Sequence, residues 1–380
     1  RRRVPAVIQH RPRQQPPPLR PPRRRRLCRL EVDVTAAVTM DVSAPAGQSR
    51  WSLTSGQRFS AARYSGRAMG TRCAVTVVAP NAADAVASAQ AAWEMVIALD
   101  HAWSRFREDS ELTALNRALA LPAPVGPGAQ PATEEVSVQV SAVTAALCAA
   151  MVAAWRDSTG LVDAAILDDL VAAGYDTDFD SAARSARPRH RRNVHSVSDL
   201  EVTGREIRAP RGLQLDSGGV GKGLAADLVS DVFADHPGVL VDLGGDVRAR
   251  GVNADGQPWV VAAADERPWA ELRGGAPMRA VGNLGQWSVT DAGVATSSVA
   301  RRRWSGGHHL IDPRTGKPAD TDLMSVTVVA DTALAAETAT KAAIIGGGDF
   351  ARAWLPERVQ AAILTFMDGT VERLTSTRRE

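Results

Sequence analysis

The chain has 380 residues, of which 44% are hydrophobic, a usual fraction for a globular protein with a real core. Residues 1–30 contain eleven arginines and no acidic residue, so the remaining chain has 34 basic and 42 acidic side chains, a net charge of −8. An acidic body argues against a nucleic-acid-binding protein. No apolar run reaches the roughly 18 residues of a membrane span, so we expect none.

The first segment, residues 1–56, is rich in Arg, Pro and Gln and lacks periodicity, which predicts a disordered basic tail. The tail lacks the apolar stretch of a secretory signal, and no such stretch precedes Cys28 as in a lipoprotein anchor. Cys28, Cys73 and Cys148 lie far apart and form no metal-type spacing. We therefore expect a cytoplasmic protein.

The body, residues 60–375, alternates between strand and helix patterns. Strands are predicted over 73–79, 239–251 (a pair around Gly244-Gly245), 259–264, 287–290 and 325–330. Helices are predicted over 82–103, 133–158, 223–235 and 333–345. A hairpin is expected over 201–216 with Gly204-Arg205 at its turn, and a basic exposed loop over 183–192. The order favours an α+β protein, one large domain with a mixed β-sheet flanked by helices.

The segment Asp216-Ser-Gly-Gly-Val-Gly-Lys-Gly follows a predicted strand and opens a predicted helix. Its four glycines let backbone N–H groups approach an anion, and the helix N-terminus adds partial positive charge. The spacing is neither that of the nucleotide P-loop, because Gly223 follows Lys222 where Ser or Thr is required, nor that of the dinucleotide fingerprint. Two interpretations remain, a phosphate site and a tight strand-to-helix turn.

Two further segments have a structural and a functional interpretation. Asp109 or Ser110 is predicted to cap a short helix whose Leu112 and Leu115 face inward, and the alternative is that the segment 104–116 forms part of a site. In the last predicted helix, Glu337, Thr340 and Lys341 share one face. A Glu–Lys pair at this spacing is ordinarily a surface ion pair. The alternative is that Glu337 offers oxygen to a hard cation such as Mg²⁺.

Residues 306–318 concentrate two histidines, a carboxylate and a guanidinium in one loop, with the sequence Gly-Gly-His-His-Leu-Ile-Asp-Pro-Arg-Thr-Gly-Lys-Pro. Pro313 and Pro318 stiffen this loop, and Gly316 allows it to turn. A purely structural loop rarely needs so many reactive groups, so we expect it to form part of a functional site.

Eight motifs occur in the order seen in the ApbE family, which the chain resembles over about residues 65–370. They are Met69-Gly-Thr, Ser104-Arg-Phe with Asp109-Ser-Glu-Leu, Leu161-Val-Asp with Ala173-Gly-Tyr, Asp216-Ser-Gly-Gly-Val-Gly-Lys-Gly, Asp242-Leu-Gly-Gly-Asp, Val294-Ala-Thr-Ser, His309-Leu-Ile-Asp-Pro-Arg-Thr-Gly and Ala336-Glu. The family comprises FAD:protein FMN transferases that act with Mg²⁺.

The resemblance implies an enzyme that binds FAD, cleaves its pyrophosphate, moves FMN to a Thr or Ser hydroxyl of an acceptor protein and releases AMP. Phosphoryl transfer of this kind depends on positioning and charge neutralisation. The alternative is a protein that binds or hydrolyses FAD without transfer, because its metal site is altered.

Roles for individual residues follow from the resemblance. His309 is the candidate for proton transfer or phosphate stabilisation, with a loop-fixing hydrogen bond as the structural alternative. Asp312 and Arg314 are expected to hold the loop. The positions that correspond to FAD contacts are Met69, Phe106, Ala173, Gly174, Tyr175, Gly218, Leu224 and Ile311. The positions that correspond to Mg²⁺ ligands are the Gly221 carbonyl, Glu337 and, as a substitute one position early, Thr340.

The chain departs from the family pattern at the metal. Glu337 is one methylene longer than the usual Asp, and Lys341 stands where many relatives have a metal-ligating Thr. A protonated lysine cannot ligate Mg²⁺. Ala164 and Ala165 replace a more usual Pro-Thr, and Ser298 replaces a common Gly. These changes are consistent with a weakened enzyme.

Overall fold

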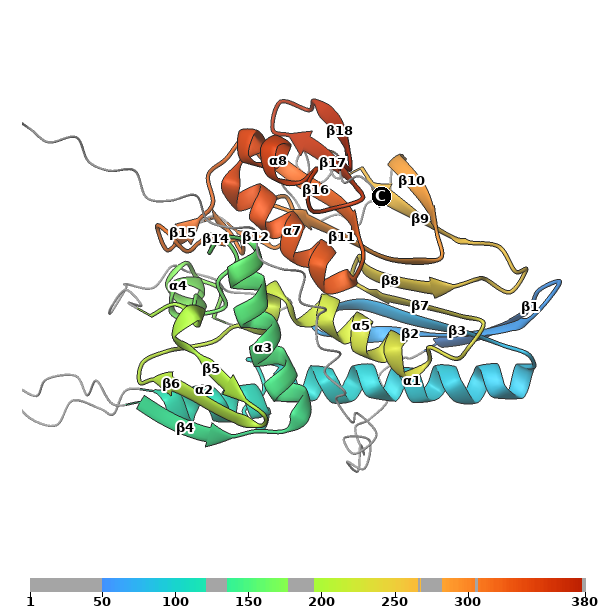
Figure 1. Cartoon of the computed structure of the whole chain (residues 1–380), viewed down its shortest axis with the longest axis horizontal. Helices are drawn as coiled ribbons and strands as arrows, with labels where there is room; N and C mark the ends of the chain where they lie inside the picture. Colours follow the sequence, from blue (N-terminus) through green and yellow to red (C-terminus); the bar gives the residue numbers. More distant parts are fainter. Residues whose placement is uncertain are drawn as a thin grey trace, which may run out of the picture. The chain divides into compact units, whose positions relative to one another are not determined.

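The computed structural model describes residues 50–120, 135–176, 195–265, 267, 282–304 and 307–377 (Figure 1). All of them belong to one compact unit, residues 32–380. The loop expected at 183–192 and most of the expected tail lie outside these residues. The end of that tail is a strand, β1 (Arg50–Ser55), so the described sheet begins before the expected boundary at residue 60.

A nine-stranded sheet forms the centre of this unit, in the order β1-β2-β3-β7-β8-β11-β16-β17-β18. Its strands after β1 are β2 (Ser60–Ala68), β3 (Thr71–Ala79), β7 (Gly238–Leu243), β8 (Asp246–Gly251), β11 (Asp291–Ser298), β16 (Leu323–Ala330), β17 (Ala361–Phe366) and β18 (Val371–Thr375). The α+β class is therefore confirmed. All the described pairings are antiparallel, whereas a mixed sheet was expected.

Tight turns explain the antiparallel pairing. Met69 and Gly70 join β2 to β3, and Gly244 and Gly245 join β7 to β8, with positive φ at all four residues. Two-residue connections can only join antiparallel neighbours. The predicted strand pair around Gly244-Gly245 is confirmed.

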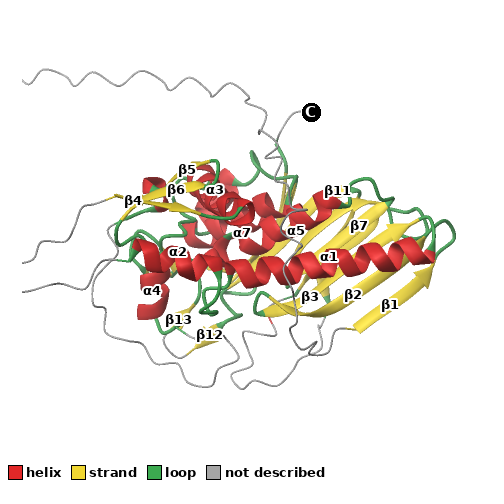
Figure 2. Cartoon of the chain, turned by 90° about the horizontal axis from the view of Figure 1, so that it is seen from below, coloured by secondary structure: helices red, strands yellow, loops and turns green. Residues whose placement is uncertain are grey.

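Three helices, α1 (Ala82–Trp103), α5 (Gly221–Val232) and α7 (Ala333–Gly346), cover one face of the sheet (Figure 2). The predicted bounds of α1 are confirmed, and α5 begins two residues before its predicted start. On the other face, β9 (Trp259–Ala264) and β10 (Asn283–Val289) form a hairpin. Its Trp259 and Val289 share a hydrophobic cluster with Val247 and Val294 of the central sheet. Strands buried on both faces, such as β16, hold the core together.

A smaller layer contains β4 (Glu135–Gln139), β5 (Glu201–Thr203) and β6 (Glu206–Pro210), beside α2 (Glu111–Leu119), α3 (Ala142–Asp157) and α4 (Leu167–Ala172). The hairpin around Gly204 is confirmed. The helix predicted over 133–158 is wrong in its first part, because β4 pairs with β6 and Ser141 caps α3. Glu-Val-Ser-Val-Gln alternates between exposed and half-buried residues, which is a strand period.

Short elements complete the part of the chain that the structure describes. They are η2 (Val197–Asp199), η3 (Ser217–Gly219), β12 (Arg303–Trp304), β13 (Gly307–His308), β14 (Ile311–Asp312), β15 (Lys317–Pro318) and α8 (Gly348–Trp354). No helix in the described ranges is long and apolar enough to cross a membrane.

Candidate functional site

A cavity of about 390 Å³ lies among the turn after β2, the end of α1, the glycine-rich segment before α5, the loop around β14, and α7. This volume is within the range of small-molecule sites. Seven of the residues predicted from the sequence line it, namely Met69, Phe106, Tyr175, Gly218, Gly221, His309 and Ile311. The tertiary structure thus gathers residues that lie up to 242 positions apart into one wall.

Five predicted residues are not in the wall. Ala173 and Gly174 precede Tyr175, and the Ala173 carbonyl accepts a hydrogen bond from Trp304 Nε1 at 2.8 Å. Leu224 packs in the main hydrophobic cluster. Glu337 and Thr340 are completely buried in α7. These five residues can therefore contribute to a ligand site only through the neighbouring residues that they contact.

Aromatic side chains form one part of the site. Tyr175 stacks on Trp304 with ring centroids 5.9 Å apart, and meets Phe106 edge-on at 5.8 Å. The Arg105 guanidinium lies 4.2 Å from the Phe106 ring centroid and 4.6 Å from that of Tyr175. Phe106 is 40% exposed, which is high for a large apolar side chain. Such a surface suits a flat ring system.

Arg105 links the aromatic residues to the glycine-rich segment. Its Nε lies 2.6 Å from Asp216 Oδ2, with both side chains at least 90% buried, and its Nη2 donates to the Tyr175 carbonyl at 2.7 Å. Asp216 Oδ1 accepts from the Gly218 N–H at 2.8 Å, which shapes the turn. The sequence pattern gives Arg105 no role. Arg105 could have been noticed from its place beside Phe106 in the Ser-Arg-Phe motif. Its ion-pair partner, Asp216, is 111 positions away in the sequence.

Two residues of the cavity wall have unusual backbone conformations. Met69 has φ of 50° and Arg302 has φ of 47°, in the left-handed region that costs energy for residues other than glycine. Strain of this kind collects at functional sites, where the surrounding structure maintains it. Arg302 is half-buried and has no hydrogen bond or ion pair to any described residue.

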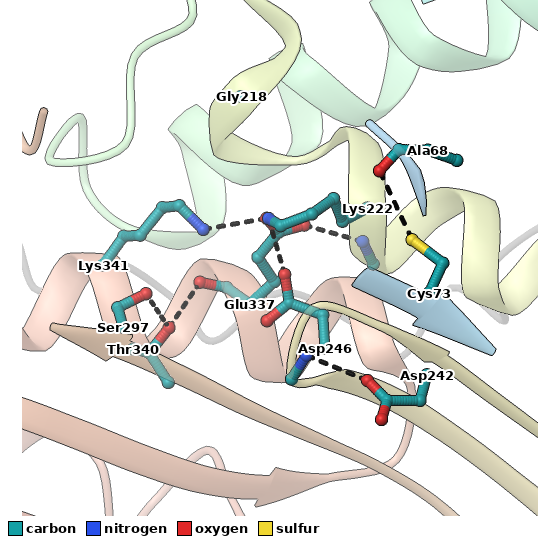
Figure 3. Close-up of polar contacts among 12 residues, drawn as sticks. Ala68, Cys73, Gly218, Lys222, Asp242, Asp246, Ser297, Glu337, Thr340 and Lys341 are labelled. Carbon is teal, nitrogen blue, oxygen red and sulfur yellow. Dashed lines mark hydrogen bonds and ion pairs between the residues drawn. The ribbon is translucent and has the colours of Figure 1, made fainter. Parts of the chain in front are cut away.

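Figure 3 shows two lysines and two carboxylates that meet, and both lysines line the cavity. Lys222 Nζ, from α5, lies 2.6 Å from Glu337 Oε1 and 2.6 Å from Asp246 Oδ2. Lys341 Nζ lies 2.9 Å from the same Oε1 of Glu337. The exposed fractions are 16% for the Lys222 side chain, 9% for Lys341, 4% for Asp246 and 0% for Glu337. The Glu337–Lys341 pair is therefore buried, not the surface pair that this spacing usually forms.

Gly223 explains how α5 and α7 come close enough for these contacts. Its N–H donates to Glu337 Oε2 at 2.7 Å, and a Cβ at this position would lie 2.7 Å from the carbonyl oxygen of Ala333. Asp227, one turn later on α5, accepts from the N–H groups of Ala333 and Leu334 at 2.9 Å each. The carboxylate thus caps α7 and fixes it against α5.

Pairing outweighs burial and favours the charged form at Glu337 and Lys222, whereas burial outweighs pairing at Asp246 and Lys341. Burial alone would raise the pKa of Glu337, but the ammonium groups of Lys222 and Lys341 outweigh burial and lower it to about 2. Burial opposes the charge of Lys222, yet Asp246 and Glu337 raise its pKa. Burial raises the pKa of Asp246 to about 6, although Lys222 acts in the opposite direction. Burial lowers the pKa of Lys341, against the effect of Glu337.

These contacts test the predicted Mg²⁺ site, and the residues present do not fit it. Both oxygens of Glu337 accept hydrogen bonds, Oε1 from two ammonium groups and Oε2 from the Gly223 N–H. A Mg²⁺ ion about 2.1 Å from Oε1 would lie no further than about 5 Å from either ammonium nitrogen. Repulsion from each would be of the order of 7 kcal/mol at an effective dielectric constant of about 20.

The other predicted metal ligands do not compensate. Thr340 Oγ1 contacts Ser297 Oγ at 2.8 Å and donates to the Glu337 carbonyl at 2.9 Å, so its hydroxyl faces β11 (Figure 3). Gly221 lines the cavity but supplies one carbonyl at most. Within the described part of the chain, no group of three His, Cys, Asp or Glu residues is arranged to hold a metal ion.

The two adjacent histidines differ in their surroundings. The Leu310 N–H donates to His308 Nδ1 at 3.2 Å, and His308 Nε2 lies 2.9 Å from the Ala319 carbonyl, so the loop uses both ring nitrogens. His309 lines the cavity, and its buried Nδ1 has no partner among the described residues. Burial, followed by the positive charges of Arg302 and Lys341, holds the pKa of His309 well below its usual value. The ring is therefore uncharged at pH 7, and the same burial and positive charges make it a weaker base than a free imidazole.

Side-chain contacts hold the shape of the 306–318 loop and cap the start of α2. Asp312 and Arg314 form a two-point ion pair with N–O distances of 2.9 Å, and Gly316 turns the loop with φ of 63°, so they hold its shape as expected. Ser110, rather than Asp109, caps α2 by accepting from the Thr113 N–H. Leu112 and Leu115 are buried, as predicted.

The sequence profile of the ApbE family matches residues 69–364. An FAD:protein FMN transferase of Salmonella typhimurium is 36% identical over 132 residues, 33% of this chain and 35% of that protein. One of Treponema pallidum is 34% identical over 160 residues, 39% of this chain and 42% of that protein. These matches span less than half the length of either relative.

Two solved structures have the same fold. The flavin transferase ApbE from Vibrio cholerae superposes with a TM-score of 0.65 at 19% identity, over 87% of this chain and 98% of that one. The apo form of the Pseudomonas stutzeri flavinyl transferase ApbE gives 0.65 at 22% identity, over 88% and 97%. At identities of 19% and 22%, this similarity shows a shared fold and nothing further.

Proposed function

This chain belongs to the ApbE family, and we propose from that premise that it is an FAD:protein FMN transferase. It binds FAD, cleaves the pyrophosphate and transfers FMN to a Thr or Ser hydroxyl of an acceptor protein, releasing AMP. One observation carries the proposal. A single cavity brings together the aromatic rings of Phe106 and Tyr175, a glycine-rich turn at a helix start, two ammonium groups and a neutral histidine.

Each part has a task in this reaction. The rings of Phe106 and Tyr175 offer a surface for the isoalloxazine. The start of α5 adds its positive dipole end near the phosphates, beside Lys222 and Lys341. The N–H groups of Gly218 and Gly223 are not available to phosphate, because they donate to Asp216 and Glu337. The positive charge of the site therefore comes largely from side chains.

His309 acts as the proton acceptor. The acceptor protein's hydroxyl oxygen attacks the phosphorus of the FMN half, and its proton passes to the His309 imidazole. The bond between that phosphorus and the bridging oxygen breaks, and AMP leaves with the oxygen. A neutral imidazole suits this role, because only the unprotonated ring accepts a proton. The Mg²⁺ implied by the resemblance is not part of the proposal, because Glu337 is already paired with two lysines.

The test is incubation of the purified chain with FAD and an acceptor domain that carries a target Thr. We expect flavin fluorescence on the acceptor in a denaturing gel and one AMP released per flavin attached. His309→Asn is expected to lower the transfer rate by about 10²-fold or more while FAD still binds. His236→Asn, at a half-buried histidine outside the cavity lining, serves as the matched control and should behave as the parent chain.

Three outcomes would contradict the proposal. Release of FMN and AMP without labelled acceptor would indicate an FAD hydrolase. FAD binding without AMP release would indicate a flavin-binding protein. An acceptor Thr→Ala variant that is still labelled would show that the attachment is not to the expected hydroxyl.

A further inference from the structure

The ion pair between Lys341 and Glu337 has a consequence for how the site neutralises phosphate. Glu337 is the carboxylate expected to hold a divalent cation, and its Oε1 is instead held by the Lys222 and Lys341 ammonium groups. A dication and these ammonium groups exclude one another by charge. A site that cleaves a pyrophosphate nevertheless needs positive charge beside it.

We propose that the Lys341 ammonium group takes the place of the divalent cation, so that the site binds the pyrophosphate of FAD without a metal ion. This inference rests on the proposed function, because it assigns the task of one residue in that reaction. Lys341 then binds the diphosphate directly, and Glu337 serves as its positioning residue.

The geometry of Lys341 supports this role. The residue lines the cavity, and 9% of its side chain is exposed. One of the three ammonium protons is directed to Glu337 Oε1 at 2.9 Å, which leaves the other two for phosphate oxygens. The Glu337 carboxylate holds the ammonium group in place before the ligand arrives. A fixed donor costs no reorganisation when it binds an anion.

Two neighbouring cationic side chains, Lys222 and Arg302, add positive charge to the cavity wall beside Lys341. Lys222 also lines the cavity and is held by Asp246 as well as Glu337. Arg302 lines it too, with no hydrogen bond or ion pair to a described residue, and its guanidinium suits phosphate. The cluster of Lys222, Lys341, Glu337 and Asp246 is neutral as a set, so Arg302 adds one further positive charge beside Lys341.

The experiment measures FAD affinity of the full chain in EDTA and in millimolar MgCl₂, by flavin fluorescence or calorimetry. We expect the same affinity within about twofold in both buffers, and no saturable binding of Mn²⁺ by electron paramagnetic resonance. Lys341→Met should weaken FAD binding in EDTA roughly tenfold or more, as expected for the loss of a charge-assisted hydrogen bond. Arg208→Met, at an exposed cationic position on β6 outside the cavity lining, should leave it unchanged.

Three results would overturn the proposed role of Lys341. An FAD affinity that rises tenfold or more with MgCl₂, or saturable Mn²⁺ binding by the parent chain, would overturn the proposal whether or not Lys341→Met folds. Folded Lys341→Met with the parent's affinity would also overturn it.

Titration with inorganic pyrophosphate in EDTA distinguishes a failure of this inference from a failure of the proposed function. If pyrophosphate binds and depends on Lys341 while FAD does not bind, the flavin function fails and the cation site stands. If FAD binds only with MgCl₂, the flavin function stands and the inference fails. If neither ligand binds in EDTA, the inference is wrong.

Discussion

The backbone N–H of Gly223 donates to Glu337 Oε2 at 2.7 Å, which joins the first turn of α5 to the second turn of α7. The contact requires that no side chain stands between the two helices. Because Oε2 accepts this hydrogen bond, Oε1 is the carboxylate oxygen that remains for Lys222 and Lys341. The same glycine therefore controls both the helix packing and the chemistry of the site.

Gly223→Ala should separate α5 from α7, because the new Cβ would lie 2.7 Å from the backbone oxygen of Ala333. We expect the free energy of unfolding to fall by about 1–3 kcal/mol, the usual cost of overpacking. Urea unfolding at pH 7.5 measures it. Gly219→Ala is the matched control, since its Cβ meets only Val162 Cγ1 at 3.7 Å. Equal effects of the two substitutions would contradict the close-approach argument.

Asp216→Ala should destabilise the fold strongly, because it leaves the Arg105 guanidinium buried without its carboxylate. Removal of one partner of a buried ion pair costs about 3–5 kcal/mol. Asp157→Ala provides the comparison. Its pair with Arg156 is about two-thirds exposed, and such pairs contribute about 0–1 kcal/mol. A loss below about 1 kcal/mol for Asp216→Ala would show that the Arg105 contact is not maintained in solution.

His308 should make the fold less stable at mildly acid pH. Burial lowers the pKa of this ring in the folded state, so the unfolded chain takes up the proton first as the pH falls. The stabilisation is complete above the ordinary histidine pKa of about 6.5 and is lost as the pH falls below it. We expect the difference in unfolding free energy between pH 7.5 and 5.5 to shrink in His308→Gln. An unchanged difference would exclude this histidine as the cause.

The two described cysteines should be unreactive in the folded protein. Burial raises the thiol pKa of both Cys73 and Cys148 to about 12, so neither forms the reactive thiolate between pH 7 and 9. In a Cys28→Ser variant, alkylation by iodoacetamide at pH 8.5 should label neither site, whereas labelling in guanidinium chloride should reach both. Rapid labelling of the native protein would mean that one of these sites opens.

Several features could be predicted from the sequence because their causes are local. The 3.6-residue apolar pattern of 82–103 and its Asn81 cap set the bounds of α1. The glycine pair at 244–245 specifies a hairpin, and Ser110 specifies a helix start. His309 could be preferred to His308 from the resemblance. The misassigned part of 133–158 shows the limit, because β4 forms by pairing with β6, about 70 residues later.

The sequence by itself determined the α+β class, the family and the residue types available for phosphate and flavin. Only the tertiary structure decided what Glu337 does. Lys222 and Glu337 are 115 positions apart, and Asp246 reaches them because β7 and β8 lie next to α5. No local pattern encodes these three neighbours, because strand order and helix packing create them. The difference between a metal ligand and a lysine-bound carboxylate is an electrostatic one, and charges interact through space rather than along the chain.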